Sequence, residues 1–484
     1  MKTLIKNGTI VTSEGEFAGD LLIEGETIRE IGLALDAQAD EVIDATGKFV
    51  LPGGIDQHTH YLFGTPHVDT SGKPTTDMAG KTLAATDAAL MGGTTTIVDH
   101  TSSQPGMSMI ETLEFKKEKC AKGVVCCDYA MHANSTEVTD ATFDEVAKLP
   151  EHGVCTLKIY MTFRGTCYYA DDMTIFRFME KCRENGITLY VHAENADIVE
   201  YLRNKFAAEG RLEAKYHIAT RPAYVEYEAI QRVIALAKAA RCPICIVHVT
   251  SQEGVDAIRQ ARNEGAGIVG ETCLHYMLKD RSFIEERPFE EAVKSIVAPA
   301  NRSRRHLDYL WKALRMGWLD IVAADHSPTK MVDKERGRED FRLIPNGAPS
   351  IGDRIQMLWT YGVEKNRMTR SELVDHCATK VAKTVGLYPR KGTLTVGSDA
   401  DVVIYDPAWR GKVTNEESPS GIDYNAFEGF DQIGRVDTVF LRGIKMVEGH
   451  RFIGPRGIGQ FIPASPYGLA YQRMEDDWRF EDPD

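Results

Sequence analysis

The sequence has no surplus of basic residues and no apolar run long enough to cross a membrane. Its 57 lysines and arginines are outnumbered by 71 aspartates and glutamates, which gives a formal net charge of -14. An acidic chain offers no basic patch for phosphate groups, so we expect neither nucleic acid nor an anionic membrane as a partner. The N-terminus also lacks the apolar core of a signal peptide.

Cysteine is sparse as well, because 10 cysteines in 484 residues do not make a disulfide scaffold. Cys126, Cys127 and Cys155 lie in apolar, strand-like runs, where a reduced thiol packs as a small hydrophobic side chain. Cys242 and Cys245 have the spacing of a redox motif, but they lead directly into another strand-like run, and we interpret them as buried thiols. Reduced thiols and the missing signal predict a cytoplasmic protein.

The pattern of apolar and turn-forming residues changes twice along the chain, and these changes predict how it divides into domains. Residues 1–52 alternate short β-rich runs with turns such as Gly8, Glu14-Gly15 and Glu24-Gly25, and β texture returns after about residue 390. We predict that segments 1–52 and 389–464 join into one small β-sandwich, with a separate domain over 53–388. The polar and aromatic tail, 465–484, is expected to be ordered on a neighbouring subunit or disordered.

The middle segment alternates apolar strands with helix-like stretches, for example 173–184 and 225–240. One strand ends near Ile55, and the others are expected at 94–99, 124–130, 154–160, 187–192, 244–249, 267–272 and 319–325. Eight strand–helix units in one block predict an α/β fold, a (β/α)₈ TIM barrel.

Metal-capable side chains occur at the predicted strand ends. His58 and His60 share one face of the first strand, because side chains alternate along a strand, and two imidazoles there suit Zn²⁺. His192, His248 and Asp325 end three further strands. A single strand-end histidine is more often a core residue than a ligand, and Asp325 could simply cap a helix. In a barrel of this type, however, the carboxyl ends of the strands meet at one face, so the joint pattern predicts a metal site.

Lys158 lies inside an apolar strand, although a protonated ammonium cannot bind a cation. A desolvated lysine can lose its proton, and the free amine can then add CO₂ to become a carbamate. The two carbamate oxygens could bridge two metals about 3.5–4 Å apart. The alternative to a bridging carbamate is that Lys158 is a structural lysine held in an ion pair.

Several motifs along the chain resemble those of the amidohydrolase superfamily, within it the hydantoinase/dihydropyrimidinase family. The matching segments are 4–9, 52–60, 92–96, 192–195, 270–273, 324–326, 344–347, 397–401 and 423–429. The resemblance implies two divalent metals, usually Zn²⁺, with His58, His60 and Asp325 on one, His192 and His248 on the other, and N6-carboxylated Lys158 between them. It also implies a homotetramer.

By the same resemblance, a hydroxide between the metals attacks the carbonyl of a cyclic ureide or imide, and Asp325 acts as general base. The product would be an N-carbamoyl amino acid, formed from a hydantoin or a dihydropyrimidine.

Of three expected substrate positions, two depart from the family pattern and the third, Asn346, matches it. Phe163 stands five residues after the lysine, where hydantoinases usually carry a tyrosine that donates its hydroxyl to the substrate. Either a neighbour replaces that donor (Tyr160, Thr162, Tyr168 or Tyr169) or the substrate does not need it. Ala298 stands where a serine is common, and the resemblance implies that Asn346 contacts the ring through its backbone.

Two other functions compete with this interpretation. The first is another cyclic amidohydrolase, allantoinase or dihydroorotase. Dihydroorotases place an arginine two residues after the second histidine, where this chain has Leu62. The second is a non-catalytic scaffold of the kind found among neuronal relatives of dihydropyrimidinase. Those relatives have lost metal ligands, whereas all six candidates are present here.

Overall fold

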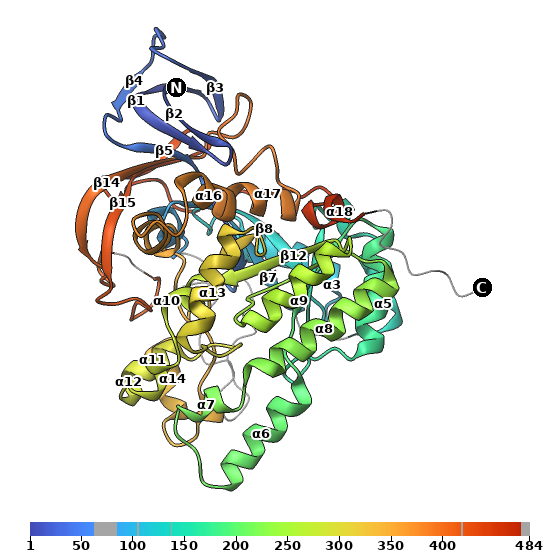
Figure 1. Ribbon diagram of the computed structural model, residues 1–484. Coiled ribbons are helices and arrows are strands. Elements are labelled where there is room, and N and C mark those ends of the chain that lie inside the picture. Colours follow the sequence, from blue (N-terminus) through green and yellow to red (C-terminus); the bar gives the residue numbers. More distant parts are fainter. Residues whose placement is uncertain (62–84, 104–105, 137, 418–419, 476–484) are drawn as a thin grey trace.

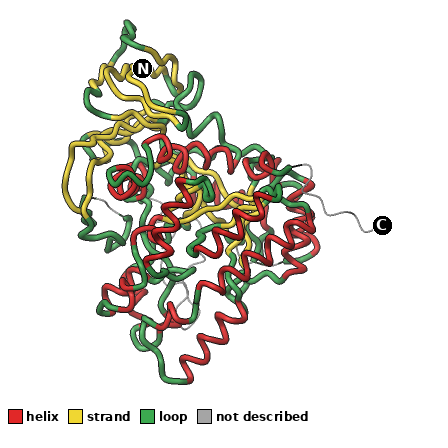
Figure 2. Tube along the Cα trace, viewed as in Figure 1, coloured by secondary structure: helices red, strands yellow, loops and turns green. Residues whose placement is uncertain are grey.

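A closed barrel of eight parallel strands forms the centre of the protein (Figures 1 and 2). The computed structural model describes residues 1–61, 85–103, 106–136, 138–417 and 420–475. The barrel strands follow one another in chain order: β6 (Gly54–Thr59), β7 (Thr94–Thr101), β8 (Asp128–Ala133), β9 (Thr156–Tyr160), β10 (Thr188–His192), β11 (Ile244–Ile246), β12 (Ile268–Cys273) and β13 (Ile321–Ala323). Backbone hydrogen bonds between the segment after β13 and β6, His326 N to His58 O among them, close the barrel. The predicted (β/α)₈ fold is confirmed.

Helices surround the barrel strands (Figure 2). The helices are α2 (Asp87–Met91), α3 (Met109–Phe115), α4 (Asp140–Val146), α5 (Asp172–Glu184), α6 (Ala196–Ala208), α7 (Tyr216–Ala219), α8 (Ala223–Ala240), α9 (Gln252–Asn263), α10 (Leu274–Leu278), α11 (Ser282–Glu285), α12 (Phe289–Ala292), α13 (Arg304–Arg315), α14 (Met331–Lys334), α15 (Arg354–Leu358), α16 (Arg370–Val374), α17 (Lys380–Val385) and α18 (Leu469–Arg473). The predicted helices at 173–184 and 225–240 correspond to α5 and α8. In the part of the chain that the structure describes, no helix is long and apolar enough to span a membrane.

Apolar side chains fill the barrel nearer the amino-terminal ends of its strands, and polar side chains replace them towards the carboxyl ends. Val98 of β7, Ala130 of β8 and Tyr190 of β10 belong to one buried cluster. Two residues further along, where the side chains face the same way again, the same strands carry three histidines, His100, His132 and His192. The packed layer thus supports a layer of imidazoles above it.

Both ends of the chain join in a second, mixed sheet, as predicted. Its strands lie in the order β17 (Arg451–Phe452), β16 (Ile444–Glu448), β15 (Asp431–Leu441), β14 (Val402–Lys412), β5 (Phe49–Pro52), β1 (Lys2–Thr12), β2 (Gly15–Glu24) and β3 (Thr27–Gly32), and β4 (Glu41–Asp44) also pairs with β1. The two ends meet where β5 pairs antiparallel with β14. Apolar side chains of both ends, such as Ile10 and Ile404, share one core.

Several strands differ from the sequence-based expectation, and β11 and β13 end at Ile246 and Ala323 rather than at 249 and 325. Gly8 does not separate two strands, since β1 runs through it with a bulge at Asn7, whose φ is +61°. The strand expected at 124–130 is β8, Asp128–Ala133. Val125, Cys126 and Cys127 are fully buried but precede the ladder, so apolar character extended the prediction too far towards the N-terminus.

The described part of the C-terminal tail, residues 465–475, packs on the barrel of its own chain rather than being disordered, and its contact with a neighbouring subunit stays a prediction. The amides of Ser465, Tyr467 and Glu475 donate to carbonyls of Gly386, Gly186 and Gly265. Arg473 of α18 forms an ion pair with buried Asp320, just before β13. The tail therefore packs against the amino-terminal side of the barrel, opposite the strand-end histidines.

Candidate metal centre and active site

One cavity, with a volume of about 140 Å³, brings together all nine residues that the sequence predicts for the site. It lies at the carboxyl ends of the barrel strands. Its lining consists of His58, His60, Lys158, Tyr160, Phe163, His192, His248, Ala298, Asp325, Ser327, Asn346 and Gly347. The residues proposed to bind metal and those proposed to bind substrate therefore face the same small volume.

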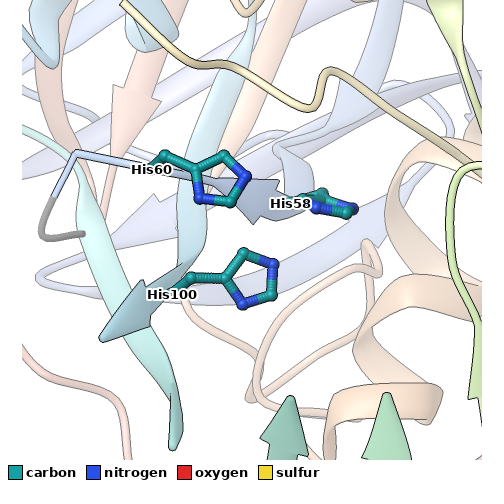
Figure 3. Close-up of side chains that lie close together, drawn as sticks. All are labelled: His58, His60 and His100. Carbon is teal, nitrogen blue, oxygen red and sulfur yellow. The ribbon is translucent and has the colours of Figure 1, made fainter. Parts of the chain in front are cut away.

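His58 and His60 converge on Asp325. Oδ1 of Asp325 lies 3.0 Å from Nε2 of His60 and 3.4 Å from Nε2 of His58. A third imidazole, His100 at the end of β7, lies against this pair (Figure 3). Ligand-capable atoms of the three histidines all lie within 4.8 Å of one another, which makes this cluster a candidate metal-binding group.

His192 and His248 form the other half of the cluster. Their ring centroids are 4.2 Å apart, and the ring of His248 is also 5.3 Å from that of His58. Nδ1 of His248 is buried without a hydrogen-bond partner among the described residues. The two predicted sets of ligands are thus contiguous rather than separate.

Lys158 lies between these sets as a fully buried lysine whose Nζ has no hydrogen-bond partner in the described part of the chain. Burial lowers its pKa to about 8, against the opposing effect of the Glu271 and Asp325 carboxyls. A neutral amine is therefore accessible near neutral pH, and this is the form that reacts with CO₂. An unsatisfied amine surrounded by imidazoles fits a bridging carbamate better than an ion-paired lysine.

Two carboxylates behind the cavity hold the imidazoles in place. Nδ1 of His58 lies 2.7 Å from Oε1 of Glu271, and this hydrogen bond orients the ring. Nε2 of His192 lies 2.8 Å from Oε2 of Glu194. Burial alone would raise the pKa of Glu194, but Arg221 and His192 lower it to about 2. His192 therefore donates through Nε2 and keeps its lone pair on Nδ1.

The imidazoles of His58 and His248 are held neutral. Burial, followed by the nearby Lys158 ammonium, lowers the pKa of His58 well below its ordinary value, and burial does the same for His248. Neutral imidazole is the form that binds metal. Unpaired buried nitrogens, neutral rings and a deprotonatable lysine make this donor set suitable for divalent metal ions.

Sequence reasoning missed His100 and His132. The strand was expected to end at Asp99, although the period-two pattern through Val98 continues to His100. His132 is fully engaged, because its ring nitrogens lie 2.8 Å from Thr156 Oγ1 and 2.7 Å from the Gln57 carbonyl. Both nitrogens of His100, in contrast, have no hydrogen-bond partner within the described ranges.

Three residues of the cavity, His248, Asp325 and Phe163, have left-handed backbone conformations, which residues other than glycine rarely adopt. The φ angles of His248 and Asp325 are +42° and +48°, and that of Phe163 is +61°. Such left-handed conformations cost of order 1–3 kcal/mol and persist where the surrounding structure imposes them. These three conformations therefore lower the free energy of unfolding, and they orient the side chains of these residues.

Phe163 contributes an apolar wall. Its ring lies edge-on to His192, with centroids 5.4 Å apart, and it offers no hydrogen-bond donor. Ala298 and Asn346 also line the cavity, and Oδ1 of Asn346 is buried without a described partner. Leu62, which bears on the dihydroorotase alternative, lies outside the described residues.

Lys334 lies behind the cavity and ties two of its walls together. Its buried Nζ donates to the carbonyls of Pro345 (2.9 Å) and Gly347 (2.7 Å) and, more weakly, of Ile296 (3.4 Å). We expect Lys334→Met to raise KM roughly tenfold with little change in kcat, because the loop carrying Asn346 loses these bonds. Steady-state kinetics measure this split, and an unchanged KM would contradict the role.

Comparison with known proteins agrees with this geometry. The model of the amidohydrolase family matches residues 49–445. A D-hydantoinase of Geobacillus stearothermophilus is 39% identical over 470 residues, which cover 97% of this chain and 98% of the relative. A D-phenylhydantoinase of Escherichia coli is 34% identical over 471 residues, covering 96% and 99%.

Solved structures are equally similar. The crystal structure of a dihydropyrimidinase from Brevibacillus agri superposes with a TM-score of 0.91 at 38% identity, covering 97% of this chain and 100% of that one. The similarity extends over both the barrel and the sheet formed by the chain ends.

Proposed function

The chain belongs to the amidohydrolase family and, within it, to the hydantoinase/dihydropyrimidinase enzymes, and on that premise we propose that it opens a hydantoin or dihydropyrimidine ring to an N-carbamoyl amino acid. The observation that carries the proposal is the single cavity lined by His58, His60, Lys158, His192, His248 and Asp325. Family membership supplies the reaction class, cleavage of a carbon–nitrogen bond in a cyclic amide.

We propose two divalent metal ions, Zn²⁺ in the first instance, at this cavity. His58, His60 and Asp325 would hold one, and His192 and His248 the other, with carboxylated Lys158 between them. Bound metals of this kind acidify water and polarise a carbonyl. The orphaned Nζ of Lys158 and Nδ1 of His248 support this assignment, because each is left without another described partner.

The protein's own groups then move the proton and hold the ring. Asp325 takes the proton from the attacking water and passes it to the leaving ring nitrogen, as a carbon–oxygen bond forms and the carbon–nitrogen bond breaks. The backbone at Ala298 and Asn346 orients the ring. Glu271 and Glu194 keep the imidazoles of His58 and His192 in their positions.

Ring opening by the purified enzyme tests the function directly. The panel is dihydrouracil, hydantoin, 5-phenylhydantoin, allantoin and dihydroorotate, with the N-carbamoyl product detected by chromatography. We expect turnover of hydantoins or dihydrouracil. Turnover of allantoin alone would favour the allantoinase alternative, and inactivity towards every ring would overturn the proposal.

Metal content provides a second test. Protein purified with divalent metal and bicarbonate is expected to hold two metal equivalents, measured by inductively coupled plasma mass spectrometry. A content below about one equivalent would contradict a binuclear site.

We also propose that the protein is a cytoplasmic homotetramer. Light scattering, which measures the mass of the assembly, tests the number of subunits.

A further inference from the structure

Tyr160 and Ser327 are the polar residues in the lining of the cavity to which the proposed chemistry gives no part, and Tyr160 is the more informative of the two. It is the last residue of β9 and lies two positions after Lys158, so both side chains face the barrel interior. In the sheet register it pairs with His192 of the neighbouring strand, and the two ring centroids are 5.8 Å apart. Nζ of Lys158 is 5.2 Å from the centroid of the Tyr160 ring.

The hydroxyl of Tyr160 is buried and has no hydrogen-bond partner in the described part of the chain. A buried hydroxyl without a partner costs about 1–3 kcal/mol, and native structures usually satisfy such groups. Because Tyr160 lines the cavity, the missing acceptor is most simply a group that enters the cavity with the substrate.

The three neighbouring candidates are less suitable donors. Among the described residues of this segment, Thr162, Tyr168 and Tyr169 do not line the cavity. The hydroxyl of Tyr169 accepts a hydrogen bond from Arg164 at 3.2 Å. The ring of Tyr168 packs edge-on against the ring of Tyr160, with centroids 5.6 Å apart.

We propose that Tyr160 donates its hydroxyl hydrogen to the carbonyl oxygen of the substrate as negative charge develops there. The inference rests on the proposed function and names one catalytic residue within it. Phe163, whose ring centroid is 6.0 Å from that of Tyr160, then serves as an apolar wall, and the chain needs no tyrosine at position 163. The donor comes from the strand end rather than from the loop that follows it.

An exchange of hydroxyls between the two positions tests this. The variants are Tyr160→Phe, Phe163→Tyr, the double variant, and Tyr169→Phe as a matched control outside the cavity. We expect Tyr160→Phe to lower kcat by about 10²–10³-fold, as for other oxyanion donors, with unchanged metal content. Phe163→Tyr alone should gain little, whereas the double variant should recover at least tenfold over Tyr160→Phe. Tyr169→Phe should stay within threefold of wild type.

The possible failures are distinguishable. If wild type is active and Tyr160→Phe stays within threefold of it, the inference is overturned while the proposed function stands. A parallel loss with Ser327→Ala would then assign the donor to Ser327. Loss of metal together with activity in Tyr160→Phe would also overturn the inference, because it indicates a structural role. Inactivity of wild type towards every ring overturns both proposals.

Discussion

Lys158→Ala is expected to lower kcat/KM by more than about 10³-fold and to leave the protein with fewer than two bound metal equivalents. The reason is the position of the amine. Lys158 is fully buried among the candidate ligands, its pKa is lowered to about 8 by burial, and its Nζ has no other described partner. Removing it deletes the one amine that can become a carbamate among the described residues that line the cavity.

Lys279→Met is the matched control. Lys279 is also fully buried, and burial lowers its pKa to about 7, but its Nζ donates to Ser295 and it does not line the candidate cavity. Both variants thus lose a buried amine, and only Lys158→Ala should lose metal. Short carboxylates added to Lys158→Ala should restore part of the activity by occupying the vacated space. An active, fully metallated Lys158→Ala would refute the carbamate.

The sequence located the candidate metal-binding side chains because a parallel barrel brings the ends of its strands to a common face. His58, His192, His248 and Asp325 are far apart in the chain, yet each follows an apolar run, and the fold class alone brings such positions together. The structure places them at one cavity. Their placement therefore required only periodicity and a count of strands.

The supporting contacts could not be read in the same way. Glu271 meets His58 across 213 residues of chain, and neither hydrophobic period nor strand count assigns a partner to a buried carboxylate. His100 was missed for a simpler reason, since the predicted strand ended at residue 99, two residues before the end of β7. A full period-two reading of β7 would have added it.

The C-terminal tail shows a different limit. Periodicity detects an amphipathic face, but residues 465–475 are held largely by backbone hydrogen bonds to Gly386, Gly186 and Gly265, which any side chain allows. Two polar side chains add to these bonds: the hydroxyl of Tyr471 contacts the carbonyls of Cys182 and Ile187, and Arg473 pairs with Asp320. An isolated arginine in a polar segment does not indicate its partner.

Asp325→Asn is expected to lower kcat by about 10²–10⁴-fold, the range for loss of a general base. In the wild type, Oδ1 of Asp325 lies 3.0 Å from Nε2 of His60. Asparagine keeps the size of the side chain and an oxygen that can face His60, but it cannot take up a proton. Although burial raises the pKa of Asp325, the hydrogen bond with His60 lowers it below the ordinary value, so the carboxylate is ionised and ready to accept. Steady-state kinetics at saturating metal measure the loss.

The control must separate lost proton transfer from lost stability, and Asp320→Asn does this at the other end of the barrel. Asp320 is as buried as any site residue and pairs with Arg262 and Arg473, but it lies away from the cavity. Its amide variant should unfold at a lower temperature while each folded molecule keeps its kcat. Asp325→Asn should show the opposite: left-handed backbone at position 325 tolerates asparagine well, so the fold persists while turnover falls. A variant that binds both metals and turns over within tenfold of wild type would show that the proton goes elsewhere, and the neighbouring imidazoles would then be the groups to examine.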